Sequence, residues 1–302
     1  MRYFGNNIKL IVNNLVVNYT DEGPDEGPVI IFIHGFPLDK SMWNNQIEIL
    51  KKDYRVITYD IRGHGESDTG NECFSIDLFA NDLIRLMDTL RINKASLCGL
   101  SLGGCIALNT IENYPERFDS LVLCGTNCYA DSPEVKVTHI KAVDDIIQHG
   151  VGKYADESVN TLFAPESFMN RTDEIISVKE IILNTSMLSL CCTLLALSKR
   201  KETCDNLSDI DVPVLILGGE KDTITLMEVA TNMHKNIRNS MLHIIGHAGH
   251  LSNLENPEEF NEQLKQFFAK VYSEPAISTD DNNSILKQLS HQLNIFLSFK
   301  PI

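Results

Sequence analysis

The feature that most constrains this chain is a serine held between glycines where a strand passes into a helix. The serine is Ser101, in the segment 99–104 with the sequence Gly-Leu-Ser-Leu-Gly-Gly. The short apolar stretch 94–98 before it predicts a buried strand, and the apolar spacing after it predicts a helix. Side chains at positions 99 and 103 would collide in so tight a turn, whereas glycine tolerates the crowding. This nucleophile-elbow pattern predicts that the Ser101 hydroxyl stands clear of the sheet, beside the N–H groups of a helix N-terminus.

Strands and helices alternate along most of the chain. Residues 8–12 and 15–19 predict two strands joined as a hairpin at Asn13-Asn14. Further buried strands are predicted by the apolar runs at 29–33, 54–60, 121–124, 212–217 and 241–245. Helical patterns separate most of these runs. The alternation predicts an α/β protein with a mostly parallel, twisted sheet and helices on both faces.

The alternation stops near residue 129 and resumes near residue 209. The segment between is helix-patterned, for example over 142–151, 173–183 and 187–198. We expect it to form a helical cap over the carboxyl ends of the strands, where ligands bind in such folds. The predicted units are 1–128 and 209–272 for the two parts of the core, and 129–208 for the helical cap.

The last 30 residues, 273–302, form a separate predicted unit. A polar linker rich in helix breakers leads into apolar residues at helical spacing, among them Ile285, Leu289 and Leu293. A short amphipathic helix is marginal alone in water. We expect it to dock on the protein's own body or on a partner subunit, so a homo-oligomer is one prediction.

The composition excludes some partners and indicates a compartment. Forty-one acidic and 26 basic residues give a formal net charge of −15, which argues against nucleic acid or an anionic membrane as partner. The eight cysteines form no metal-type Cys-x-x-Cys pair, and several lie within apolar segments, so we expect buried free thiols. The sequence has no apolar signal core and no apolar run of 18 residues. These features predict a cytoplasmic, reducing location.

A serine hydroxyl is a weak nucleophile and requires a base, normally a histidine that a carboxylate orients. The carboxylate candidates are Glu220 and Asp222, which follow a late strand, and the base candidates are His247 and His250, which follow the last strand. No cluster of histidines or carboxylates has metal-ligand spacing, so we expect neither a metal nor a cofactor. The residues alone leave both choices open.

The chain resembles the α/β-hydrolase superfamily, and within it the group around 3-oxoadipate enol-lactone hydrolases and similar small esterases. The matching segments span residues 29 to about 268: His34-Gly35-Phe36-Pro37 with Trp43, Asp60 to Ser67, the glycine-rich turn at Ser101, Gly219 to Asp222, and Ala248 to Pro257. The family pattern of Gly-His, then Glu five residues later and Pro two further on, fits His250 and fails from His247. The same alignment assigns the acid to Asp222.

The resemblance implies a role for each matched residue. Ser101 would attack a carbonyl carbon, His250 would transfer the proton, and Asp222 would orient the imidazole. The N–H groups of Leu102 and Phe36 would form the oxyanion hole. His34 and His64 would shape loops without transferring protons.

These roles imply a hydrolase of a small carboxylic ester or lactone. The same triad would also suit a carbon–carbon bond hydrolase, a thioesterase or a perhydrolase of the haloperoxidase type. A ligand receptor with slow turnover is the prediction from another class. Dehalogenase or epoxide-hydrolase chemistry is disfavoured, because those relatives carry aspartate where this chain has Ser101.

Overall fold

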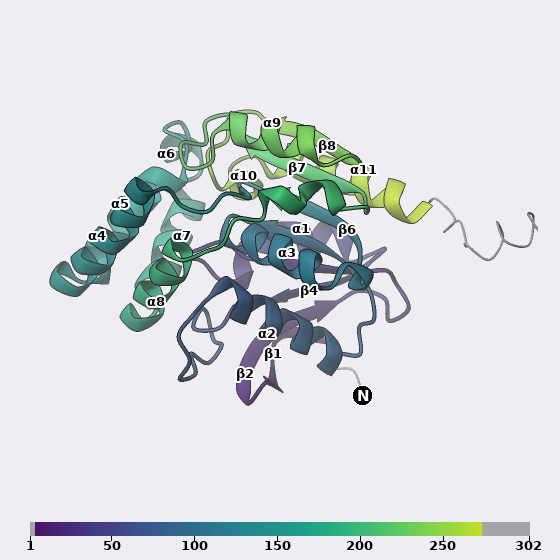
Figure 1. Cartoon of the computed structure of the whole chain (residues 1–302), viewed down its shortest axis with the longest axis horizontal. Helices are drawn as coiled ribbons and strands as arrows, with labels where there is room; N and C mark the ends of the chain where they lie inside the picture. Colours follow the sequence, from purple (N-terminus) through teal and green to yellow (C-terminus); the bar gives the residue numbers. More distant parts are fainter. Residues whose placement is uncertain (1–3, 274–302) are drawn as a thin grey trace, which may run out of the picture.

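A twisted sheet runs through the structure, a computed structural model that describes residues 4–273 (Figure 1). Within these residues the sheet has eight strands in the order β1-β2-β4-β3-β5-β6-β7-β8. Among the described strands only β1–β2 and β2–β4 pair antiparallel, which confirms the predicted mostly parallel sheet. The strands are β1 (Gly5–Val12), β2 (Leu15–Glu22), β3 (Val29–Ile33), β4 (Arg55–Tyr59), β5 (Ala95–Leu100), β6 (Phe118–Cys124), β7 (Val214–Gly219) and β8 (Ser240–Ile245).

The central strands are buried on both faces, as their continuous apolar sequences predict. Every residue of β5 is buried, and so are four of the five residues of β3. At the edge, β1 exposes alternate residues to solvent, and the predicted hairpin turns at Asn13 and Asn14, both with positive φ. Asparagine adopts this left-handed conformation more readily than most residues do.

Helices cover both faces of the sheet and divide the apolar core into two layers. On one face lie α2 and α3, together with α9; on the other lie α1 and α11, whose phenylalanines at 260, 267 and 268 are buried. These helices and the short ones of the core are η1 (Lys40–Trp43), α1 (Asn44–Leu50), α2 (Ile76–Thr89), α3 (Leu102–Asn113), η2 (Pro115–Arg117), η3 (Cys204–Asp209), α9 (Met227–Asn236), α10 (Ser252–Glu255) and α11 (Pro257–Ser273).

The chain reverses its direction across the sheet between β3 and β5. After β3 it adds β4 on one side, and after β5 it adds β6, β7 and β8 on the other. The loops leaving β3 and β5 therefore diverge at the carboxyl edge. In open α/β sheets this reversal creates the crevice where ligands bind.

The five helices inserted between β6 and β7 extend from one side of the sheet (Figure 1). They are α4 (Pro133–His149), α5 (Val151–Leu162), α6 (Ser167–Asn170), α7 (Thr172–Asn184) and α8 (Met187–Ser198). The predictions for α7 and α8 agree with the structure within a residue. The predicted helix 142–151 is wrong in both bounds: α4 begins at Pro133, after the capping Ser132, and it ends at His149 because Gly150 adopts φ +84 and separates α4 from α5.

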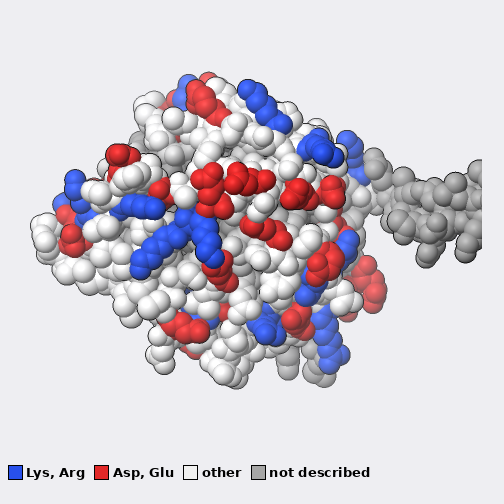
Figure 2. Space-filling view, viewed as in Figure 1, with Lys and Arg blue, Asp and Glu red and all other residues white. Residues whose placement is uncertain are grey.

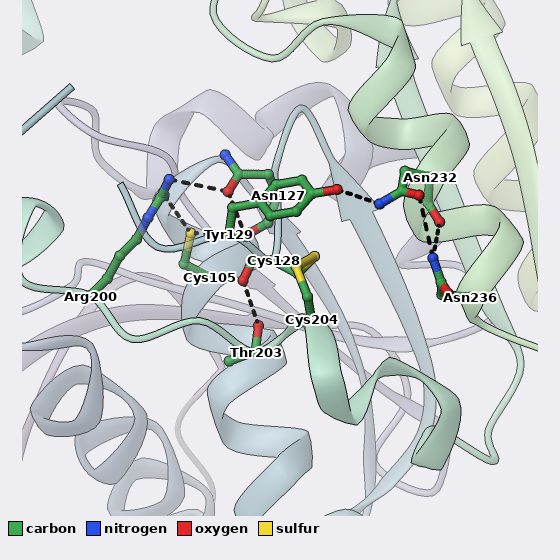
Figure 3. Close-up of a disulfide and its surroundings, with 9 residues drawn as sticks. All are labelled: Cys105, Asn127, Cys128, Tyr129, Arg200, Thr203, Cys204, Asn232 and Asn236. Carbon is green, nitrogen blue, oxygen red and sulfur yellow. Dashed lines mark hydrogen bonds between the residues drawn. A yellow bond between two sulfur atoms is a disulfide. The ribbon is translucent and has the colours of Figure 1, made fainter. Parts of the chain in front are cut away.

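A disulfide joins Cys128 and Cys204 at the two ends of this insertion (Figure 3). It corrects the expectation of free thiols for these two cysteines, whereas the buried free thiols expected elsewhere occur at positions 98, 105, 124 and 191. The Thr203 N–H also donates to the carbonyl of Cys128 at 2.8 Å, so the two ends run side by side. Their sequence separation of 76 residues is why no local pattern indicated the pair.

Within residues 4–273 no single helix is long and apolar enough to cross a membrane. The pair α7 and α8 meets that requirement by length and composition alone, with a bend of 98° between the two helices. The predicted amphipathic tail at 273–302 lies outside the described residues except for Ser273, and its docking stays a prediction.

Candidate active site

Ser101 lies at the turn from β5 into α3, at the carboxyl edge of the sheet. Its backbone angles are φ 54 and ψ −112, an unusual conformation for a residue with a side chain. The Ser101 N–H donates to the carbonyl of Cys124 on the neighbouring strand at 2.9 Å, and its carbonyl accepts from the Thr126 hydroxyl at 2.8 Å. Strained backbone persists only where surrounding contacts enforce it, and here those contacts come from β6 and the loop after it.

The glycines of this turn are required by close packing. A Cβ on Gly99 would overlap the carbonyl of Gly103, and a Cβ on Gly103 would overlap the carbonyl of Ile33 at the end of β3. The backbones of β3, β5 and α3 therefore meet without intervening side chains. This contact sets Ser101 directly beside the loop that leaves β3.

That loop carries Gly35 and Phe36 past the serine. A Cβ built on Gly35 would lie 3.6 Å from the Cβ of Ser101, so the backbone just before Phe36 passes against the serine. His34 holds the loop from below: its Nε2 accepts the Ile61 N–H at 2.9 Å and its Nδ1 lies 2.9 Å from the carbonyl of Gly35. Because Nε2 is an acceptor here, the ring proton lies on Nδ1 and is donated to that carbonyl.

His250 and Asp222 form a buried pair next to this turn. His250 Nδ1 lies 2.9 Å from Asp222 Oδ2, and the two side chains are 1% and 0% exposed. The other carboxylate oxygen of Asp222 accepts the N–H groups of Ile224 and Thr225 at 2.8 and 2.9 Å. The backbone thus orients the carboxylate, and the carboxylate orients the imidazole.

A glycine after β6 brings this pair to the same edge as the serine. A Cβ on Gly125 would lie 3.2 Å from His250 Nδ1, so the imidazole packs against bare backbone at this position. Gly125 directly follows Cys124, whose carbonyl binds the Ser101 N–H. The sequence analysis did not single out Gly125, although a glycine at the carboxyl end of a buried strand was the signal available for it.

The competing candidates His247 and Glu220 lie at the surface. The His247 side chain is 86% exposed and contacts Glu166 at 3.2 Å, while its N–H donates to Glu220 at 3.0 Å. This hydrogen bond from His247 and the neighbouring Lys221 lower the pKa of Glu220. Of the four candidates left open by the residues alone, the structure pairs Asp222 with His250 in a buried site and leaves the other two in solvent.

Glu255 is a buried residue whose role the sequence analysis missed. Its carboxylate accepts the Gly249 N–H at 2.9 Å on the His250 loop, and the Ala164 N–H at 2.7 Å and Ser167 hydroxyl at 2.6 Å on the insertion. Burial raises the pKa of Glu255, although these hydrogen bonds oppose that shift. One carboxylate therefore ties the insertion to the residue before His250.

The remaining histidines of the matched segments are buried scaffolding. His34 and His64 are fully buried, with ring centroids 5.4 Å apart, and burial lowers their pKa values to about 4 and about 3. Both are therefore neutral near pH 7. Within residues 4–273 no group of three or more histidine, cysteine or acidic side chains is placed to hold a metal ion.

Comparison with known proteins identifies the family to which this fold belongs. The family described as alpha/beta hydrolase fold matches residues 28–148, and a family described as TAP-like protein matches residues 181–276. The chain is 29% identical over 259 residues to 3-oxoadipate enol-lactonase 2 of Acinetobacter baylyi, covering 85% of this chain and 94% of that protein.

Two solved structures are similar over most of their length. A thermophilic esterase from Thermogutta terrifontis superimposes with a TM-score of 0.83 at 30% identity, covering 88% of this chain and 98% of the esterase. The enol-lactonase of Burkholderia xenovorans LB400 superimposes with a TM-score of 0.81 at 25% identity, covering 87% of this chain and 100% of that protein.

Proposed function

This chain belongs to the α/β-hydrolase superfamily and is an enzyme that acts on ester bonds, and from this we propose that it cleaves a small carboxylic ester or lactone through Ser101, His250 and Asp222. The observation that carries the proposal is the buried His250–Asp222 pair at the edge where Ser101 turns into α3. An arrangement in which a serine, an imidazole and a carboxylate lie at one edge of the sheet is suited to acyl transfer.

In the proposed reaction the Ser101 hydroxyl attacks the carbonyl carbon while His250 Nε2 accepts its proton. His250 then gives the proton to the departing alcohol, which leaves an acyl-enzyme on Ser101. A water molecule, activated by the same imidazole, releases the acid in the second half of the reaction. Asp222 holds the imidazole through Nδ1 and stabilises its protonated form.

We place the oxyanion between two backbone N–H groups, those of Leu102 and Phe36. Leu102 is the first residue of α3, where helix N–H groups lack partners within the helix and the helix dipole favours negative charge. Phe36 follows Gly35, whose backbone passes against Ser101. Each such donor typically contributes about 3–4 kcal/mol to the transition state.

Release of 4-nitrophenol from acetyl and butyryl esters tests this proposal. We expect Ser101→Ala to lower kcat by about 10³-fold or more with unchanged folding, and Asp222→Asn to retain the most activity among the three triad variants. Turnover that survives in Ser101→Ala would contradict it. A wild type that binds esters but cleaves them no faster than Ser101→Ala would support the receptor alternative.

Two other predictions stay proposals. We propose that residues 129–208 act as a cap, because the Leu162 carbonyl accepts the His250 N–H at 3.0 Å and Glu255 ties the insertion to the same loop.

The cytoplasmic location stays a prediction and is opposed by the Cys128–Cys204 disulfide, since such bonds persist mainly in oxidising compartments.

A further inference from the structure

The side chain of Phe36 lies at the junction between the core and the insertion. It is half-buried and packs against both the main core and an insertion cluster built around Ile146, Leu190 and Leu194. Its ring lies 6.0 Å from that of His64 below and 6.4 Å from that of Tyr154 on α5. The insertion cluster therefore begins within one side-chain length of the proposed oxyanion hole.

The strand order separates the side of the site that holds His250 from the side that holds Phe36. Ser101 follows β5, Phe36 follows β3 on one side of it, and Gly125 with His250 lies at β6 on the other side. Because His250 must protonate the leaving alcohol, the alcohol lies on the β6 side. The oxyanion lies on the β3 side, at the Phe36 N–H, and we place the acyl chain away from the leaving alcohol, against the Phe36 side chain and the insertion cluster.

The titratable groups around Phe36 are neutral. Burial raises the pKa of Tyr154 to about 12, and it lowers the pKa values of His64 and His34 to about 3 and about 4. The helix α8, which supplies Leu190 and Leu194, contains no charged residue over its whole length. The charged groups that act on these two histidines are Asp39, Asp60 and Lys40, and the cation among them, Lys40, is bound to Asp60 at 3.3 Å.

Charged residues near Ile146 on α4 and α5 are exposed to solvent or already paired. Asp144 is exposed, and Asp145 binds Lys153 at 2.6 Å. The half-buried cation on the segment after α8, Arg200, binds Asp131 at 2.7 Å. It also donates to the Cys105 sulfur at 3.2 Å (Figure 3). A half-buried lysine of α4, Lys136, lies about two turns before Val143. Acidic side chains are spread widely over the surface in Figure 2, in keeping with the net charge of −15.

We propose that this site takes esters or lactones whose acyl portion is uncharged and apolar, and that it discriminates against acyl groups bearing a carboxylate. The inference rests on the proposed function. A carboxylate placed against Phe36 and Leu190 would lose its hydration without gaining a cation, which disfavours binding strongly. The buried charge of Asp222 and the acidic surface act in the same direction.

Three 4-nitrophenyl esters of matched length test the proposal: the hexanoate, the adipate half-ester with a free carboxylate, and the methyl ester of that adipate. The methyl ester controls for length and polarity without the charge. We expect kcat/KM for the free carboxylate to fall at least about 100-fold below that of the methyl ester, with the hexanoate the best substrate.

Matched variants on α4 place a cation inside and outside the cluster. Val143 is half-buried in the cluster, whereas Ile147, one turn further along, is 61% exposed. Lysine tolerates partial burial by extending its charged end. We expect Val143→Lys to raise kcat/KM on the carboxylate ester about tenfold or more, and Ile147→Lys to change it less than twofold. If Val143→Lys fails to fold, the comparison of the three esters with wild type decides alone.

Equal efficiency on the carboxylate and methyl esters would overturn this inference while leaving the proposed function intact. Efficient cleavage of the carboxylate ester that Lys136→Gln abolishes would overturn it as well, and would identify the counter-charge. Failure to cleave any of the three esters in a Ser101-dependent manner would overturn the proposed function and this inference together.

Discussion

The two sides of the proposed site are built in different ways. On the core side, Ser101, Asp222 and His250 are held by backbone hydrogen bonds and by glycines that admit bare backbone. On the insertion side, α4 buries only Ile146 among its 17 residues, and Val135, Val137, Ile140 and Ile147 are 43–61% exposed. Specific hydrogen bonds and close backbone contacts fix the side chains on the core side. The insertion side presents an apolar surface without such contacts.

This difference follows from what each side is proposed to do. Acyl transfer needs groups placed within a fraction of an ångström, since small misplacements reduce the rate steeply. Recognition of an apolar acyl group depends on area and on the absence of charge, which many side chains supply equally well. Substitutions should therefore have larger and more specific effects on the core side.

The largest expected effect separates the two histidines of the loop after β8. We expect His250→Ala to lower kcat for 4-nitrophenyl butyrate by about 10³-fold or more, because the proton acceptor of Ser101 is lost. We expect His247→Ala to stay within about tenfold of wild type, because its side chain is in solvent. An inactive His247→Ala beside an active His250→Ala would reverse the assignment of the base.

The next effect concerns Glu255, which joins the two sides. In Glu255→Gln the amide would face N–H donors at Gly249 and Ala164 and could not accept from both. We expect kcat to fall about tenfold to 100-fold, with a smaller change in KM, because the His250 loop shifts. The matched control is Glu258→Gln, whose side chain is 79% exposed and which should behave as wild type. Equal behaviour of the two variants would show that the Glu255 carboxylate does not position the loop that carries His250.

The disulfide at the base of the insertion should affect stability more than catalysis. Closing a loop of this length removes about 4 kcal/mol of chain entropy from the unfolded state. We expect the Cys128→Ser, Cys204→Ser double variant to melt several degrees lower while kcat stays within about threefold. Thiol titration of the denatured protein should find six free thiols before reduction and eight after. Eight thiols before reduction would contradict the bond.

The smallest expected effect concerns the burial of His64, which should change how stability depends on pH. Burial lowers the pKa of His64 from about 6.5 in the unfolded chain to about 3 in the folded protein, so folding favours its neutral form. Its contribution to stability is complete above pH 6.5 and is lost as the pH falls from 6.5 toward 3, by about 1.4 kcal/mol per pH unit. The free energy of unfolding should therefore fall less between pH 6.5 and 4.5 in His64→Gln than in wild type. Parallel curves would contradict this account.

The fold and most of the candidate site could be predicted because their signals are local. A buried parallel strand reads as a continuous apolar run, and the glycines around Ser101 mark a turn that admits no side chains. The bounds of α4 were predicted less well than those of α7 and α8, because the start at Pro133 was missed and the apolar spacing across Gly150 hid the break between α4 and α5. The Cys128–Cys204 bond was missed for the opposite reason, since nothing local relates residues 76 apart.

By itself the sequence determined the α/β alternation, the nucleophile turn and a short set of acid and base candidates, since each depends on residues close together in the chain. The family pattern chose Asp222 and His250 among these candidates. Only the tertiary structure showed that the two form a buried pair while Glu220 and His247 lie in solvent, because burial depends on which distant segments cover a loop. The hydrogen bonds of Glu255 to the insertion and the contact of Phe36 with Tyr154 also depend on distant segments. They exist only where the insertion folds back onto the core, and packing of that kind has no local pattern.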